Sequence, residues 1–311
     1  MDINQASNLA SSASSAAIAA IPLMYAGAGE LVAEKSGVLN LGVEGMMLMG
    51  AVTGYAVTAI TGNPWLGILA SVFAGLAMAL LFGFLTITML ANQVATGLSL
   101  TIFGIGFSAY VGKPYTSAAV RSTIDVMPIP VLKSIPVLGP AIFSLDPLGY
   151  LAFFMFIVIG WFMYKTRAGL VLRSVGESPS VAHSAGFPVV GVRYGATLFG
   201  NGMAGIAGGY YSIVYLHLAG TVDVGARLDR ARARRVRDVA AGALADRRDS
   251  VRRSDGVAVL RAGHRRAGAD AFLAMLPYIA TIVVLVLISR NPNTIKLNAP
   301  ASLGKPFFAA S

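Results

Sequence analysis

The strongest constraint on this chain is a run of 68 residues, 45–112, that contains no aspartate, glutamate, lysine or arginine. A helix that crosses a lipid bilayer needs about 20 mostly apolar residues, so the run has room for three. Turn-forming residues interrupt it twice, at Gly62-Asn63-Pro64 and near Leu90-Ala91-Asn92. The run therefore predicts three successive membrane-spanning helices joined by short turns.

The whole chain shares this apolar character. Of its 311 residues, 56% are apolar and 12% are charged, against about 25% charged residues in an ordinary soluble domain. This composition excludes a soluble globular protein and a disordered chain, and it predicts an all-α, polytopic transmembrane helical bundle. Because the first 34 residues contain no lysine or arginine, the first helix is interpreted as a retained span and not a cleaved signal peptide. The visible spans are expected at residues 9–29, 43–61, 64–89, 93–112, 147–164, 195–217 and 271–289.

Basic residues set the expected orientation. Lys165, Arg173 and Arg193 lie between the fifth and sixth spans, and short basic loops stay in the cytoplasm. Residues 165–193 are therefore predicted to form a cytoplasmic loop, and residues 113–146 an extracytoplasmic one. A chain of this kind would be a multi-pass protein of the inner or plasma membrane.

The sequence offers no catalytic or metal-binding constellation. It has no cysteine, and its three histidines, His183, His217 and His264, are too far apart to form a metal-ligand pattern. The phosphate-binding motif Gly-x-x-x-x-Gly-Lys-Ser/Thr does not occur, since both Gly-Lys pairs are followed by proline. We therefore expect no catalytic residue, no metal, no cofactor and no ATP hydrolysis by this chain. Any work that it performs would be driven by a partner or a gradient.

A polar, glycine-rich stretch separates the first two spans. Glu30, Glu34 and Glu44 flank residues 35–43. One interpretation is a cytoplasmic turn in which Asn40 caps the next helix and Glu44 lies in its first turn, where the helix dipole favours an acidic group. The other is a re-entrant break that lines a polar path, because ionisable groups at membrane depth are costly and often functional.

More polar residues lie within apolar sequence. Asn92, Gln93 and Thr96 begin one predicted helix, and Asn201 lies inside another. Each side chain either hydrogen-bonds a neighbouring helix or faces the same polar path. The candidate residues of a translocation path are Asn40, Glu44, Asn92, Gln93, Thr96 and Asn201.

One predicted helix has a face of small residues. Gly200, Ala204 and Gly208 are spaced four apart and therefore share that face. Small residues at this spacing let helix backbones approach closely. The spacing predicts tight helix packing and gives no information about a substrate.

The predicted cytoplasmic loop contains signals for a short helix. Ser178 can cap it, Pro179 suits its first turn, and Gly186 can end it. A helix of about two turns is therefore expected at residues 179–185. Such a helix would either dock on a cytoplasmic protein or rest on the lipid surface.

Four blocks of sequence resemble one family of membrane proteins. Residues 29–51, 92–104, 173–186 and 276–290 are similar to blocks of ABC-importer permease subunits and follow the same order. The class is the one that serves ribose-type sugars and branched-chain amino acids, and the resemblance is closest to its simple-sugar/nucleoside branch. It extends over the chain except for residues 220–270.

This resemblance implies a permease subunit of an ATP-driven importer for nucleosides or simple sugars, and not an enzyme. Its implied partners are ATP-binding cassette ATPase subunits, a second permease subunit, an extracytoplasmic solute-binding protein, a small-molecule solute and the lipid bilayer, with no nucleic acid. The block 173–186 resembles the family's cytoplasmic coupling loop, which docks on the ATPase. The residues implied in coupling are Arg173, Gly176, Glu177, Ser178, Pro179, Ala182, Ala185 and Gly186.

A gradient-driven secondary transporter is the alternative. It would need a carboxylate within the membrane or an inverted repeat. The acidic residues lie at the ends of the predicted spans, and the sequence shows no internal repeat. An intramembrane enzyme would need a cluster of nucleophile, base or metal ligands, which the three histidines do not supply.

Residues 221–270 depart from the membrane pattern. They hold 13 of the 24 lysines and arginines and seven of the 14 acidic residues. Each arginine placed at bilayer depth would cost roughly 2.5–3.5 kcal/mol. Three interpretations compete: a soluble loop, a basic insert that binds RNA or lipid, and the product of a shifted reading frame.

The shifted frame is the favoured interpretation. Permitted codons for residues 228–240, read one base later, encode Trp-Ile-Ala-Leu-Ala-Leu-Val-Val-Phe-Ala-Thr-Trp, an apolar segment suited to a membrane. A basic insert fits less well, because no aromatic stacking residues accompany the arginines. The hypothesis is that a frameshift, compensated near Asp270, has replaced about two membrane elements with charged sequence.

Overall fold

The computed structural model describes residues 3–115, 123–127, 143–215 and 300–308. These ranges belong to one compact unit, which comprises residues 1–220 and 300–311. The second unit, residues 221–299, lies outside the described residues. The predicted last span at 271–289 and the arginine-rich segment at 221–270 therefore stay predictions.

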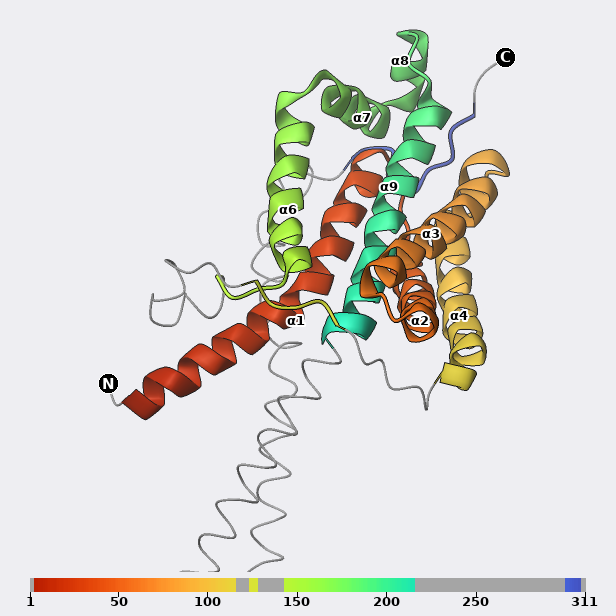
Figure 1. The fold of residues 1–311 in the computed structure, drawn as a ribbon. Helices are drawn as coiled ribbons and strands as arrows, with labels where there is room; N and C mark the ends of the chain where they lie inside the picture. The colour runs from red at the N-terminus through yellow and green to blue at the C-terminus, as the bar shows by residue number, and fades with distance from the viewer. Residues whose placement is uncertain (1–2, 116–122, 128–142, 216–299, 309–311) are drawn as a thin grey trace, which may run out of the picture. The chain divides into compact units, whose positions relative to one another are not determined.

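Every regular element in the described ranges is a helix, which confirms the all-helical prediction for that part of the chain (Figure 1). Five of these helices are long and apolar enough to cross a membrane, and the predicted count of seven spans stays untested. The longer helices are α1 (Ile3–Lys35), α2 (Val43–Thr61), α3 (Pro64–Gly83), α4 (Gln93–Gly112), α6 (Pro147–Lys165), α7 (Arg167–Glu177) and α9 (Val189–Tyr210). The shorter ones are the turns Phe84–Thr88, Lys113–Tyr115 and Tyr211–Tyr215 and helix α8 (Pro179–Ser184).

Local capping explains why several helices start where the sequence predicts. The side chain of Asn63 accepts a hydrogen bond from the amide of Trp65 at the start of α3, and Asn92 accepts one from Ala95 at the start of α4. The turn between α3 and α4 includes Leu90, whose φ of 57° is left-handed and stops the helix. Helices α2 and α4 have the predicted bounds.

The other helices differ from their predictions: α3 ends at Gly83 and is followed by the π-helical turn Phe84–Thr88, where a single span at 64–89 is predicted, and α6 ends one residue later than predicted. Helix α1 extends to Ile3 and Lys35, beyond the apolar core at 9–29, and α9 begins at Val189, directly after Pro188. Helix α7 was predicted as part of a loop. Its sequence is amphipathic and basic, so the search for uniformly apolar runs did not detect it.

Helix α9 lies at the centre of the described bundle. It packs against α1, α2 and α3, while α4 packs on α2 and α6 packs on α1 (Figure 1). The predicted small-residue face forms these contacts: a Cβ placed on Gly200 would lie 2.8 Å from the carbonyl oxygen of Gly29, and one on Gly208 would overlap the carbonyl oxygen of Met47. Ala204 is buried on the same face. The predicted close packing is confirmed.

Candidate functional site

The connection between α1 and α2, residues 36–42, turns back into the bundle. Gly29 of α1 lies against Gly200 of α9, and Asn40 bonds to the next residue, Asn201. The helix from Gly29 to Lys35 rises about 9 Å, so the chain returns by a similar distance after α1 ends. Ser36 and Asn40 are almost fully buried. We call this segment the inserted loop.

The inserted loop corrects one prediction and agrees with another. Gly42, and not Asn40, is the N-cap residue of α2, and no side chain caps that helix. Asn40 instead accepts a hydrogen bond from the amide of Gly42 at 2.8 Å, which stabilises the loop. Glu44 lies in the first turn of α2 as predicted, and its side chain is exposed. The burial shows that Ser36 and Asn40 pack inside the described part of the bundle. The polar path itself stays a prediction.

Four polar side chains meet around the inserted loop. Nδ2 of Asn40 donates to Oδ1 of Asn201 at 2.8 Å, and the amide of Asn40 donates to Oε1 of Glu30 at 3.3 Å. The amide of Leu39 donates to Oε1 of Gln93 at 2.8 Å. We call Glu30, Asn40, Gln93 and Asn201 the polar junction. It joins α1, α4 and α9 through the loop.

Three of the six candidate path residues belong to this junction and three do not. Glu44 and Asn92 are exposed, and Asn92 caps α4. Thr96 is half-buried, and its amide donates to the carbonyl of Asn92. Glu30 belongs to the junction but is not among the predicted path residues, because the first predicted span ends at residue 29 and leaves this carboxylate outside it. Helix α1 continues to Lys35, so Glu30 lies within the helix.

Gln93 has the one side-chain donor in the junction that lacks a partner. The residue is 2% exposed, and its Nε2 makes no hydrogen bond. Because Oε1 accepts from Leu39, Nε2 is fixed in orientation. A buried amide donor without a partner is unfavourable, so Nε2 of Gln93 is a polar group whose cost the described contacts do not offset.

The predicted short helix in the cytoplasmic loop is present as α8. Pro179 lies in its first turn, and Gly186, with a φ of 87°, follows its end as predicted. Ser178 is the N-cap residue, yet its side chain makes no capping hydrogen bond, which corrects that part of the prediction. Helix α8 buries Ala182 and exposes Val181 and Ala185. One face therefore holds the helix in place while the other is free for contact.

The residues of α7 for which the resemblance implies a coupling role have structural contacts of their own. The guanidinium of Arg173 lies over the ring of Tyr164, 5.3 Å from its centroid. Gly176 is buried where a Cβ would overlap the carbonyl oxygen of Lys35. Glu177 is exposed at the end of the helix. Arg173 and Gly176 thus fix α7 against α6 and the end of α1.

A second polar cluster lies at the opposite end of α6, and sequence analysis missed it. The hydroxyl of Tyr210 donates to Oδ1 of Asp146 at 2.7 Å, and that of Tyr25 donates to the carbonyl of Leu148 at 2.6 Å. Burial raises the pKa of the Asp146 carboxyl. The hydrogen bonds that this carboxyl accepts from Tyr210 and from backbone amides, including that of Gly149, lower the pKa and partly offset the effect of burial. The cluster joins α1, α6 and α9. Asp146 before Pro147 is a helix-start signal that could have identified it.

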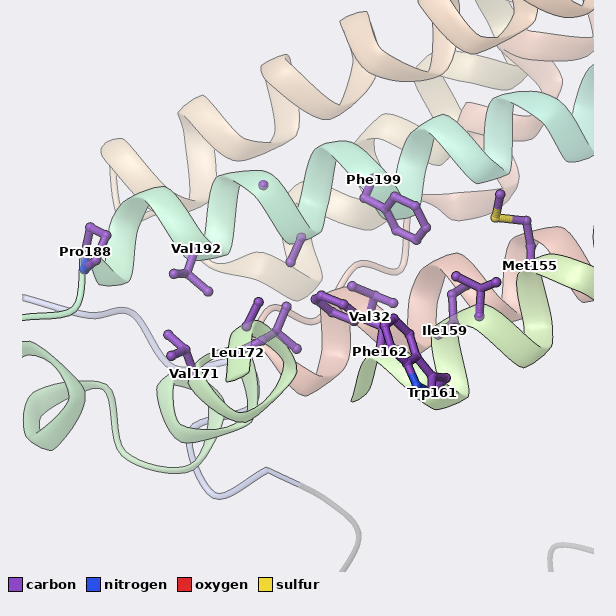
Figure 2. A pocket seen from close by; sticks show the side chains of 14 residues that line it. Val32, Met155, Ile159, Trp161, Phe162, Val171, Leu172, Pro188, Val192 and Phe199 are labelled. Atoms are coloured by element: carbon purple, nitrogen blue, oxygen red, sulfur yellow. The ribbon is translucent and has the colours of Figure 1, made fainter. Parts of the chain in front are cut away.

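An apolar pocket of about 730 Å³ lies between α6, α7 and α9 (Figure 2). Every residue that lines it is apolar or glycine, including Trp161, Phe162 and Phe199. A sugar or nucleoside carries hydroxyl groups that need hydrogen-bond partners. The pocket therefore does not resemble a solute site, and the polar junction is the better candidate.

Comparison with known proteins identifies the family. The sequence profile of the permease component of branched-chain amino acid transport systems matches residues 8–228. The chain belongs to this family. The family inferred from the sequence blocks is thereby confirmed, although the block 276–290 lies outside the matched residues. The permease is a multi-pass membrane protein of the plasma membrane.

Curated relatives of this permease are transport proteins. A putative glucose ABC transporter permease protein from Haloferax volcanii is 40% identical over 204 residues, which cover 64% of this chain and 62% of the relative. A guanosine ABC transporter permease protein from Bacillus subtilis is 32% identical, covering 62% and 64%. A nucleoside ABC transporter permease protein from Lactococcus lactis is 28% identical, covering 61% and 63%.

Each of these matches covers only part of this chain and part of the relative. The permease spans 62–64% of the length of these three relatives. The family match ends at residue 228, shortly after the arginine-rich segment begins. No solved structure matches the chain.

Proposed function

We propose that this permease is the membrane-spanning subunit of an ATP-driven importer for nucleosides or simple sugars. The observation that carries the proposal is the family match over residues 8–228, together with relatives named for glucose, guanosine and nucleosides. Its partners would be ATP-binding cassette ATPase subunits, a second permease and an extracytoplasmic solute-binding protein. ATP hydrolysis by the partners would move α8 and alternate access to the path.

We place the solute path at the polar junction. Asn40, Gln93 and Asn201 come from three separate segments, and Gln93 offers an unpaired amide donor. An uncharged sugar or nucleoside needs a few directed hydrogen bonds in an otherwise apolar bundle. Glu44, Asn92 and Thr96 would face the path only at its edges, since they lie outside the junction.

A gradient-driven transporter is the second candidate function, and the position of Glu30 favours it. The carboxylate of Glu30 lies in the candidate span Ala17–Lys35 and accepts a hydrogen bond from the buried loop. An intramembrane carboxylate is the feature that a proton-coupled transporter needs. The two candidates separate in one assay: uptake of radiolabelled guanosine or glucose into cells that lack their own carriers. Loss of uptake on ATP depletion supports the importer, and loss on collapse of the proton gradient alone supports the alternative.

We also propose that residues 221–270 are the product of a frameshift. In support, the family match stops at residue 228 while the block 276–290 again resembles the family's last helix. Independent sequencing of the gene tests this directly, because a confirmed frame with the arginine codons intact would exclude a sequencing error. The uptake experiments on single-residue variants therefore use the gene with its frame restored.

Changing the exposed face of α8 is expected to uncouple the permease from its ATPase. Val181 is 66% exposed, and Val181→Glu places a charge where an apolar contact is expected. We expect ATP-driven uptake to fall at least about tenfold while the amount of folded permease is unchanged, since central contacts carry most of the affinity of an interface. Val181→Leu is the matched control. Equal uptake by the glutamate and leucine variants would exclude α8 as the docking helix.

Replacing the unpaired donor of Gln93 by an acceptor tests the path. Gln93→Glu keeps an acceptor for the amide of Leu39 and puts a carboxyl oxygen in place of Nε2, which also brings a charge or a proton to this buried position. One lost hydrogen bond to an uncharged solute predicts a KM for uptake that rises about three- to tenfold. Ser99→Ala, at an exposed position on α4, serves as the control. A change in thermal stability with no change in KM would show that Gln93 is structural.

A further inference from the structure

The C-terminal residues 301–308 cross the end of the bundle that carries α8. Figure 1 shows this segment in blue beside the ends of α1 and α9. It contacts α7, α8, α9 and the inserted loop, although it lies more than 90 residues from each of them in sequence. We call these residues the strap.

Hydrogen bonds fix the strap to α7 and to the inserted loop. The amide and the hydroxyl of Ser302 both donate to the carbonyl oxygen of Gly176, at 3.1 and 2.5 Å. The amide of Gly304 donates to the carbonyl oxygen of Gly37 at 3.2 Å. Because Ser302 is buried, these bonds are shielded from water.

Arg193 of α9 holds the strap from the other side. Its side chain is 3% exposed, and it donates to the carbonyl oxygen of Lys305 at 3.2 Å and to the hydroxyl of Ser302 at 3.3 Å. A buried guanidinium that loses its acceptors is strongly unfavourable. Release of the strap would remove both acceptors at once, so Arg193 opposes release.

The far end of the strap packs on the coupling helix. The rings of Phe307 and His183 are 5.6 Å apart in an edge-to-face arrangement. Phe307 also packs against a small apolar cluster of Val175, Ala182 and Val189. The buried face of α8 is therefore covered in part by the strap.

We propose that the strap links the coupling helix to the solute path, with Arg193 and Ser302 as positioning residues. One end is fixed at α8 through Phe307, and the other at the inserted loop through Gly304. The loop leads within three residues from Gly37 to Asn40 of the polar junction. A displacement of α8 is thus passed to the junction. This inference rests on the proposed function, because it takes α8 as the site that the ATPase moves.

Disulfide trapping tests the contact between strap and loop. A Cβ placed on Gly304 lies 3.9 Å from Cβ of Leu39, within the range of about 3.5–4.5 Å seen in disulfides. The chain has no cysteine, so Leu39→Cys with Gly304→Cys gives a single defined pair. In the full chain in lipid vesicles, we expect this pair to oxidise readily and each single cysteine variant to stay reduced. Absence of the disulfide would overturn the inference.

Variants of the anchor test the role of Arg193 and Ser302. Arg193→Gln or Ser302→Ala, added to the cysteine pair, is expected to slow disulfide formation at least fivefold. The first removes the guanidinium that donates to the strap, and the second removes the hydroxyl that donates to Gly176. Ser302→Thr keeps the hydroxyl and is expected to restore the parent rate. An unchanged rate in both disrupting variants would show that neither residue positions the strap.

Two neighbouring phenylalanines give a matched test at α8. A nitroxide label on Ser184→Cys is expected to gain mobility in Phe307→Ala and to stay unchanged in Phe308→Ala, since Phe308 is 70% exposed. In the assembled complex, Phe307→Ala is expected to lower the ratio of solute transported to ATP hydrolysed severalfold. Reduced folding alone would lower the rate of transport and the rate of ATP hydrolysis together and leave their ratio unchanged. Equal label mobility, or an unchanged transport ratio, would contradict the linkage. If the parent complex with its reading frame restored lacks ATP-driven uptake, the proposed function fails, while the trapping and label results still decide the contacts.

Discussion

Replacing Gly208 by leucine is expected to remove nearly all folded permease from the membrane. A Cβ at this position would overlap the carbonyl oxygen of Met47 and lie 2.8 Å from the amide nitrogen of Ala51, both backbone atoms of α2. Backbone cannot move aside as a flexible side chain can, so α9 must shift away from its neighbours. Overpacking in a core costs typically 1–3 kcal/mol for small additions, and leucine adds four carbons against a total stability of about 5–15 kcal/mol.

The amount of monodisperse permease, measured by fluorescence-detected gel filtration of a tagged chain, checks this expectation. Gly208→Ala is expected to give an intermediate yield. Gly106→Leu is the matched control, because a Cβ on Gly106 of α4 would have no atom within 4 Å. A yield of Gly208→Leu equal to that of Gly106→Leu would show that α2 and α9 do not pack as described.

The start of a helix was predictable where a local capping signal sets it. Helix α4 starts at the cap residue Asn92, and α3 starts at the Asn63-Pro64 signal, so their sequences alone define those ends. Helix α7 was missed because the prediction searched for apolar spans and read basic sequence as loop. A local signal existed: the hydroxyl of Thr166 accepts a hydrogen bond from the amide of Gly169 at 3.0 Å, which is a helix cap.

The sequence was sufficient to select single residues of the candidate site, but not to predict that they contact one another. Asn40, Gln93 and Asn201 stood out because polar side chains are costly in apolar surroundings. Their meeting depends on the chain turning back along α9 after α1, and neither composition nor periodicity encodes such a return. Arg193 was interpreted only as a cytoplasmic charge. Its burial depends on Ser302, which is 109 residues away in sequence.

Restoring the reading frame across residues 221–270 is expected to convert an inactive permease into an active one. The segment as it stands carries 13 arginines, and apolar membrane sequence is what the family resemblance implies there. At roughly 2.5–3.5 kcal/mol for each arginine at bilayer depth, even two or three such residues would offset the stability of a typical domain. The path would then lack about two of its helical elements.

Uptake of labelled guanosine or glucose, with the partner subunits co-expressed, measures the outcome. We expect uptake near background for the original gene and at least tenfold higher uptake for the restored one. A gene with the same number of synonymous changes, left in the original frame, controls for expression. Full uptake by the original gene would mean that residues 221–270 are a native loop outside the bilayer. The outcome therefore separates the frameshift from the two interpretations of the segment as native sequence, because only a frameshift predicts a gain of function from a change that removes charge throughout it.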